Sequence, residues 1–128
     1  MEIADYIGVP FKSHGRSIDE GFDCYGFSID FCKEVLHRIL PDFHEYEVAD
    51  DKGFNENYLD VMKKIDVKKV DNKDKKYGDL ILFYTNGKAT HIGIALENDS
   101  FIHCDRFGVR VLELERYGKY YEVFAWQK

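Results

Sequence analysis

The stretch Gly21-Phe22-Asp23-Cys24-Tyr25-Gly26-Phe27 places a cysteine directly after a residue that is favourable at a helix N-cap. The Asp23 carboxylate can accept the backbone N–H of Gly26. Apolar residues then recur at helical spacing as far as Pro41. They are Phe27, Phe31, Cys32, Val35, Leu36 and Ile39. The sequence therefore predicts a helix that begins at Cys24 and ends just before Pro41.

The second half of the chain alternates short β-prone segments with turn residues. We expect strands at residues 80–84, 91–96, 101–104, 109–114 and 121–126. Before them we expect a short helix at 2–7, a surface loop at 12–21 and a helix at 56–65. Helices followed by an antiparallel sheet indicate an α+β fold in which N-terminal helices pack on a C-terminal sheet. A chain of 128 residues suits one core, so we expect residues 1–128 to form a single domain.

The amino-acid composition argues against nucleic-acid and membrane partners. The formal net charge is −6, which disfavours nucleic acid as a partner because phosphates require clustered Lys and Arg. No apolar run approaches the roughly 20 residues that span a bilayer, so we expect no membrane partner. The first ten residues carry Glu2 and Asp5 where a secretory signal has positive charge. We therefore expect synthesis in the cytoplasm without a signal peptide.

Three cysteines make an odd number without a CxxC pair, which argues against a disulfide framework and a structural zinc site. We expect no cofactor. A free cysteine most often packs as a small apolar residue, and this is our interpretation of Cys32 and Cys104. Cys24 differs, because the free N–H groups and the positive dipole at a helix start favour a thiolate. The charge of Asp23 partly opposes this effect.

His91 and His103 lie on two expected strands joined by a turn around residues 97–99. A three-residue loop puts Gly93 opposite His103 and both histidines on one face, as diagonal neighbours about 7 Å apart at the backbone. A loop of two or four residues would put them on opposite faces. The hydrophobic pattern favours the three-residue loop, because this loop places five apolar residues on one face of the sheet. That face consists of Ile92, Ile94, Leu96, Ile102 and Cys104. Gly93 and Ala95, which lie beside the histidines, have small side chains. We therefore expect this face of the sheet to pack close to the helix start at Cys24.

These residue types suit nucleophilic catalysis. His91 can take the proton of Cys24 as general base, and His103 can orient the His91 ring through its other nitrogen. Backbone amides at Cys24 and its neighbours can form an oxyanion hole. Gly26 leaves space beside the sulfur for a substrate chain. Zinc bound by Cys24 and the two histidines is an alternative.

Four segments resemble, in order, the motifs of the NlpC/P60 family of cell-wall peptidases. Residues 21–27 resemble the family's Asp-Cys-Ser-Gly nucleophile segment, and residues 77–83 resemble its Pro-Gly-Asp-Leu strand. Residues 91–96 resemble its His-Val-Gly-Ile strand, and residues 101–104 resemble the strand that bears the third catalytic residue. The resemblance implies a papain-like fold. It also implies hydrolysis of peptide bonds in peptidoglycan stem peptides by the cysteine and the two histidines.

The chain departs from the family motifs at some positions. Tyr25 replaces the serine after the nucleophile, and Tyr77 replaces the proline that opens the second motif. Residues 8–11 resemble the family's Gly-x-Pro-Tyr segment, whose tyrosine helps the active site, but Phe11 has no hydroxyl. That role is then vacant or filled elsewhere. The expected substrate-binding or oxyanion residues are Asp23, Tyr25, Gly26 and Phe11.

Residues 15–26 look most like the family branch found in phage tail assembly and lysis proteins, where an aromatic residue follows the cysteine. This resemblance implies phage tail proteins as partners and delivery to the cell wall by a phage particle. Two alternatives remain open. The same triad could act on another amide, as in an injected amidase toxin or a lipid-directed acyltransferase. The protein could also be a structural tail or interaction protein with an impaired site.

Overall fold

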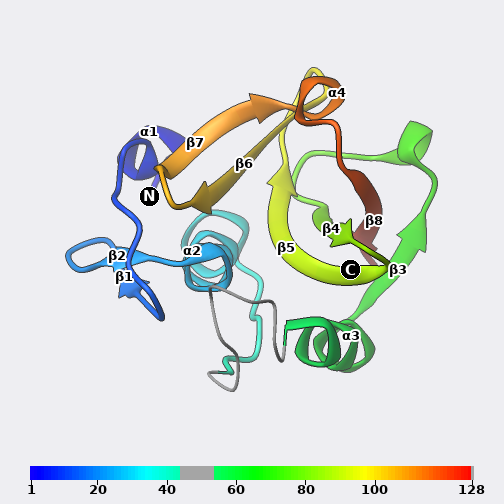
Figure 1. The fold of residues 1–128 in the computed structure, drawn as a ribbon, viewed down its shortest axis with the longest axis horizontal. Coiled ribbons are helices and arrows are strands. Elements are labelled where there is room, and N and C mark those ends of the chain that lie inside the picture. The colour runs from blue at the N-terminus through cyan, green and yellow to red at the C-terminus, as the bar shows by residue number, and fades with distance from the viewer. Residues whose placement is uncertain (44–53, 128) are drawn as a thin grey trace.

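The computed structural model describes residues 1–43 and 54–127, and it has the expected α+β architecture (Figure 1). The helices are α1 (Ile3–Tyr6), α2 (Cys24–Phe31), the π-helical turn η1 (Cys32–Leu36), α3 (Phe54–Lys64), the 3-10 turn η2 (Asn72–Asp74) and α4 (Leu114–Tyr117). The strands are β1 (Arg16–Ser17), β2 (Gly21–Phe22), β3 (Val67–Val70), β4 (Leu80–Thr85), β5 (Lys88–Ala95), β6 (Ser100–Asp105), β7 (Gly108–Glu113) and β8 (Tyr120–Trp126).

Six strands form one antiparallel sheet in the order β3-β8-β4-β5-β6-β7. The five strands predicted from the sequence are present as β4 to β8. The edge strand β3 was not predicted, because Val67-Lys68-Lys69-Val70 lacks the period-two alternation of a half-buried strand. Its pairing with β8 makes it a strand. The expected loop at residues 12–21 likewise contains most of a short hairpin, β1 and β2.

Helix α2 packs on the isoleucine face of β5 and β6. Its buried Phe27 and Phe31 belong to the same core cluster as the isoleucines of these strands. On the histidine face, Ala95 and Phe101 belong to a second cluster together with Leu114 of α4. The prediction that the surface around Gly93 and Ala95 packs against the helix start is therefore wrong, because α2 covers the opposite face of the sheet.

Strands β5 and β6 are paired over only part of their length. Ile94 aligns with Ile102, and this register confirms the predicted three-residue loop and the shared face of the two histidines. Among the described residues of the two strands, pairing extends no further toward the start of β5 and the end of β6. Helix α2 contacts both strands, and Figure 1 shows their ribbons moving apart beside it. The sheet is therefore open beside the helix.

The first long helix ends earlier than predicted. At Cys32 α2 gives way to the π-helical turn η1, and His37 ends the helix with φ 58° and ψ 43°. The backbone N–H of Arg38 donates to the carbonyl of Cys32 at 2.8 Å. A π turn adds a residue and rotates the following side chains out of the 3.6-residue period. Ile39, predicted to lie on the apolar face of the helix, lies beyond this helix end and is 72% exposed.

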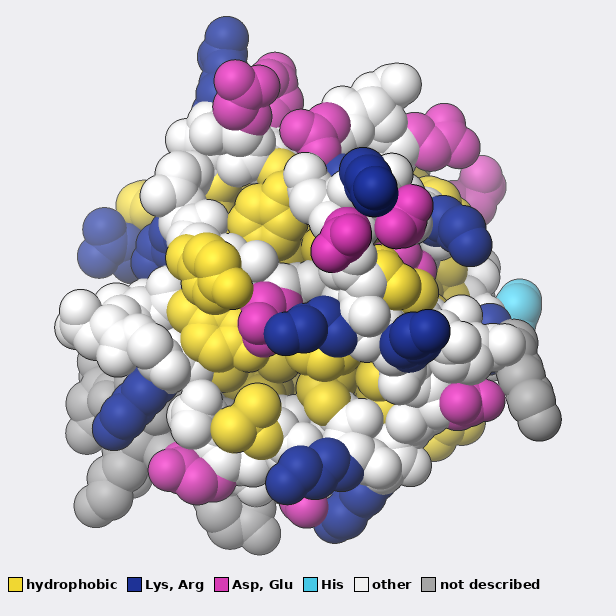
Figure 2. All heavy atoms as spheres, turned by 90° about the vertical axis from the view of Figure 1, so that its right-hand side faces the viewer, with side chains coloured by type: hydrophobic (Ala, Val, Ile, Leu, Met, Phe, Trp, Pro, Cys, Tyr) yellow, Lys and Arg dark blue, Asp and Glu magenta, His cyan; other side chains and the backbone are white. Residues whose placement is uncertain are grey.

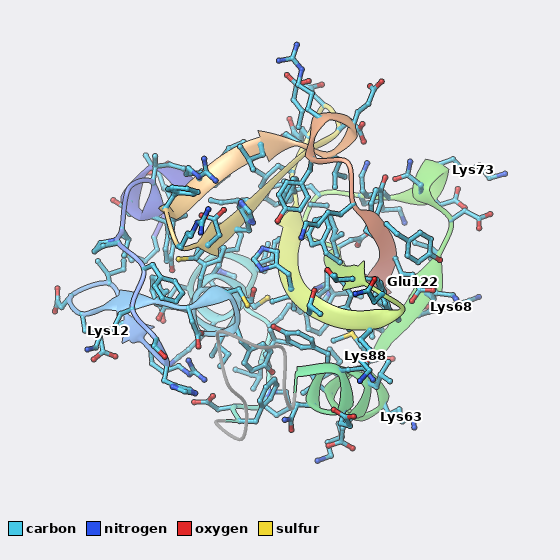
Figure 3. The ribbon with its side chains drawn as sticks, in the orientation of Figure 1. Lys12, Lys63, Lys68, Lys73, Lys88 and Glu122 are labelled. Carbon is cyan, nitrogen blue, oxygen red and sulfur yellow. The ribbon has the colours of Figure 1, made fainter. Side chains whose placement is uncertain are left out.

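Acidic and basic side chains lie among apolar ones over the described part of the face that carries β3 and β8 (Figure 2). Lys63, Lys68 and Lys73 extend away from the molecule on this side (Figure 3). Lys69 pairs with Glu122 at 3.1 Å. These lysines are interspersed with carboxylates. None of the described helices is long and apolar enough to cross a membrane.

Replacement of His37 by glycine should raise the free energy of unfolding by about 0.5–1 kcal/mol, because glycine adopts the left-handed conformation without steric cost. Urea denaturation of wild type, His37→Gly and His37→Ala would test this. His37→Ala retains the strain and serves as the control. Equal stability of the glycine and alanine variants would contradict the prediction.

Candidate active site

The buried carboxylate of Asp23 holds the start of α2. Its Oδ1 accepts the backbone N–H of Gly26 at 2.7 Å, which confirms the predicted N-cap. The Arg16 guanidinium lies 3.0 Å from the same oxygen and also donates to the carbonyl of Phe43 at 2.9 Å. Arg16 therefore neutralises a carboxylate that is only 1% exposed. Cys24 follows at the first position of the helix and is itself 7% exposed.

Tyr25 and Gly26 do not line the cleft that contains Cys24 and His91. The Tyr25 ring is buried in a stack on Phe43, with 4.2 Å between ring centroids, and its hydroxyl donates to the carbonyl of Pro41. A Cβ atom on Gly26 would lie 1.9 Å from the carbonyl oxygen of Gly15. The space that we expected for a substrate beside Gly26 is thus filled by the protein's own backbone. Glycine is required here because the chain crosses the helix in contact with it.

The two histidines form a direct hydrogen bond, with 2.6 Å between Nε2 of His91 and Nδ1 of His103. His103 is fully buried, whereas His91 is partly buried. A Cβ atom on Gly93 would lie 3.0 Å from the Phe101 ring and 3.4 Å from Cβ of His103, so the glycine makes room for both side chains. The Tyr117 ring packs edge-on against His103, with 5.5 Å between centroids. These contacts leave the His103 ring little freedom.

One cleft of about 370 Å³ brings together segments that are distant in the sequence. It is lined by Phe11, Asp23, Cys24, Thr90, His91 and residues 104–107. Four predicted site residues therefore share this cleft, and His103 lies behind His91. Among the described residues, no group of three or more His, Cys, Asp and Glu side chains is arranged to hold a metal ion.

Tyr58 of α3 is a site residue that the sequence did not reveal. Its hydroxyl lies 3.2 Å from Sγ of Cys24, and the side chain is fully buried. It therefore supplies a hydroxyl that Phe11 lacks. Tyr58 occurs on an amphipathic helix with buried Val61 and Met62, so its sequence pattern is that of an ordinary core position.

Burial controls the protonation of Cys24 and His91. It raises the pKa of the Cys24 thiol to about 12, and the charge of Asp23 acts in the same direction. Hydrogen bonds from Tyr58 and from backbone groups lower that pKa only in part. Burial also lowers the pKa of His91 well below its usual value, with smaller contributions from His103 and Lys119. Both groups are therefore neutral near pH 7, contrary to the expected thiolate. Desolvation of a full charge outweighs the partial charge of a helix dipole.

Cys32 and Cys104 are fully buried free thiols, which agrees with the predicted packing role. Sγ of Cys104 donates to the carbonyl of Phe22 at 3.2 Å. Burial raises the pKa of each thiol to about 12. Cys24 and Cys104 both line the cleft with His91, and Cys24 is the one of the two at a helix start.

The NlpC/P60 family profile matches residues 8–127, almost the whole chain. The chain belongs to the NlpC/P60 family. The NlpC/P60 domain of the peptidoglycan hydrolase SagA shares its fold, with a TM-score of 0.64 and 24% identity over 94% of this chain and 93% of that one. An NlpC/P60 family protein from Bacillus cereus superposes with a TM-score of 0.65 at 23% identity, over 91% of this chain and 35% of that one.

Two similar curated proteins come from Escherichia coli strain K12. The murein DD-endopeptidase MepH is 28% identical over 112 residues, which are 86% of this chain and 36% of MepH. The murein DD-endopeptidase and LD-carboxypeptidase MepS is 27% identical over 104 residues, which are 80% of this chain and 45% of MepS. The chain thus spans less than half the length of these relatives.

The alkylation rate of Cys24 should rise with pH throughout the range from about pH 5 to pH 9. Its thiol pKa is raised to about 12, so the thiolate fraction increases about tenfold per pH unit over this range. Iodoacetamide labelling followed by peptide mass spectrometry would measure the rate, with Cys24→Ala as the background. A rate plateau at mildly acidic pH would instead indicate a thiolate–imidazolium pair.

Tyr58→Phe should slow a Cys24-dependent reaction by roughly 2- to 10-fold, the equivalent of one net hydrogen bond. The variant keeps the ring in the core, so thermal stability should change little. Tyr84→Phe is the matched control, because the Tyr84 hydroxyl bonds to Glu122 away from the cleft. Equal rates in the Tyr58 and Tyr84 variants would show that the hydroxyl beside sulfur has no role.

Proposed function

We propose that this protein is a cysteine hydrolase, an endopeptidase or amidase, that cleaves amide bonds in peptidoglycan stem peptides. Cys24 is the nucleophile, His91 the general base and His103 the orienting residue of a single NlpC/P60 domain formed by residues 1–128. One observation carries the proposal: the thiol at a capped helix start shares a cleft with an imidazole whose far nitrogen is 2.6 Å from a second imidazole. The endopeptidase names of MepH and MepS support this substrate class.

The neutral pair is the reactant state of a general-base reaction. His91 takes the proton of Cys24 while the sulfur attacks the carbonyl carbon of the amide, and the carbonyl electron pair moves to oxygen. Backbone N–H groups at the start of α2 can stabilise this oxyanion. His91 then protonates the amide nitrogen, the C–N bond breaks, and the amine leaves a thioester on Cys24. A water that gives a proton to His91 hydrolyses the thioester, which releases the acid and restores the thiol.

The cleft suits a peptide with charges of both signs. Phe11 and Phe107 supply apolar surface, while Asp105 and Arg106 supply one negative and one positive side chain. Stem peptides carry carboxylates and amines on a short backbone, which fits this mixture. Phage tail partners and delivery by a phage particle, which residues 15–26 imply by resemblance, stay predictions.

Incubation of purified cell walls with the protein should release muropeptides, and Cys24→Ala should reduce the release by at least roughly 10³-fold. Chromatography with mass spectrometry of the soluble products gives the rate and identifies the bond. Cys32→Ala is the matched control, because it removes another buried thiol outside the cleft. Equal product release by wild type and Cys24→Ala would favour a structural role over hydrolysis.

A further inference from the structure

The second histidine has a buried nitrogen without a hydrogen-bond partner. Nε2 of His103 makes no hydrogen bond to the described residues, although the side chain is fully buried. The nearest carboxylate oxygen, Oδ2 of Asp105, lies 3.8 Å away. Asp105 follows His103 by two residues on β6, so both side chains lie on the same face of the sheet. A movement of about 1 Å would bring the two atoms within hydrogen-bond distance.

The Asp105 carboxylate is held in place from two sides. Its Oδ1 accepts the backbone N–H of Phe107 at 2.9 Å. Its Oδ2 accepts from the Arg110 guanidinium at 2.8 Å, and Arg110 is the residue directly opposite His103 on β7. The oxygen that faces His103 therefore also accepts a hydrogen bond from Arg110. A fixed carboxylate beside an imidazole nitrogen favours a proton on that nitrogen.

We propose that Asp105 is a positioning residue that sets the tautomers of both histidines, an inference that rests on the proposed hydrolase function. Asp105 keeps the His103 proton on Nε2, so Nδ1 of His103 is an acceptor. His91 must then carry its proton on Nε2 to complete the 2.6 Å hydrogen bond. The remaining nitrogen of His91, Nδ1, is left with a free electron pair for the proton of Cys24.

The same arrangement stabilises the charge that forms during the reaction. When His91 takes the thiol proton, it becomes an imidazolium in a buried site. His103 accepts its Nε2 proton in a hydrogen bond, and the negative charge of Asp105 lies behind His103. Arg110 offsets part of that charge, which limits the attraction of Asp105 for a second proton on His103.

Asp105→Asn tests the proposal with little change in shape. When the amide oxygen keeps the hydrogen bond from Phe107, the amide NH₂ takes the place of Oδ2. It then faces Arg110 and Nε2 of His103, and it requires an acceptor from His103. The His103 proton then moves to Nδ1, and His91 must accept on Nε2 and carry its proton on Nδ1.

¹⁵N NMR of the imidazole nitrogens should show both rings as Nε2–H in wild type and as Nδ1–H in Asp105→Asn. We expect kcat on cell-wall peptides to fall by at least roughly 10²-fold.

Two further variants separate the tautomer from other effects. Asp105→Glu retains a carboxylate and should restore the wild-type tautomers and part of kcat. Asp99→Asn is the matched control, because Asp99 pairs with Lys75 at 2.6 Å on a distant turn. It should leave both the NMR signals and kcat unchanged.

Wild-type His103 protonated on Nδ1, or unchanged tautomers in Asp105→Asn, would overturn the assignment of Asp105. Loss of kcat without a change in tautomer would also overturn it, because that result indicates a purely structural contribution. If the wild type releases no peptide from cell walls, the proposed hydrolase function fails. The NMR measurement still decides the role of Asp105 in that case, because it needs no substrate.

Discussion

The capping hydrogen bond from Gly26 to the buried carboxylate of Asp23 is the interaction on which the site depends. It pairs a backbone N–H that the helix leaves free, and Arg16 balances the charge that this requires. Arg16 lies on the segment that crosses α2 in contact with Gly26. One ion pair thus joins the hairpin to the helix and places Cys24. The Asp23 carboxylate also raises the pKa of the neighbouring Cys24 thiol, because its negative charge disfavours a thiolate.

The incomplete pairing of β5 with β6 is the second requirement. Helix α2 covers the isoleucine face of the sheet, whereas His91 and His103 project from the other face. A fully paired sheet would separate the thiol from the imidazoles. Because the pairing of β5 with β6 stops at Ile94 and Ile102, Cys24 and His91 can line the same cleft. Beside the candidate site, β5 and β6 therefore lack ladder hydrogen bonds to each other.

Burial gives the site its electrostatic character. Neutral thiol and neutral imidazole are favoured because desolvation penalises both charged forms. The polar atoms continue from His91 through His103 to Asp105, and Arg110 balances the carboxylate at the end of this chain. Tyr117 packs against His103 from the side. Such a chain can disperse a transient positive charge without a permanent ion pair at sulfur.

The sequence by itself determined the features that follow from short-range periodicity: the capped helix start at Cys24, the strands of the second half and the shared face of the histidines. The same parity rule applied two residues beyond His103 would also have indicated Asp105. Only the tertiary structure decided the pairing of β3, the face that α2 covers, the exposure of Ile39 and the contact of Tyr58 with sulfur. These depend on hydrogen bonds and burial between distant segments. The protonation of the thiol depends on them too, because its pKa reflects everything that excludes water from it.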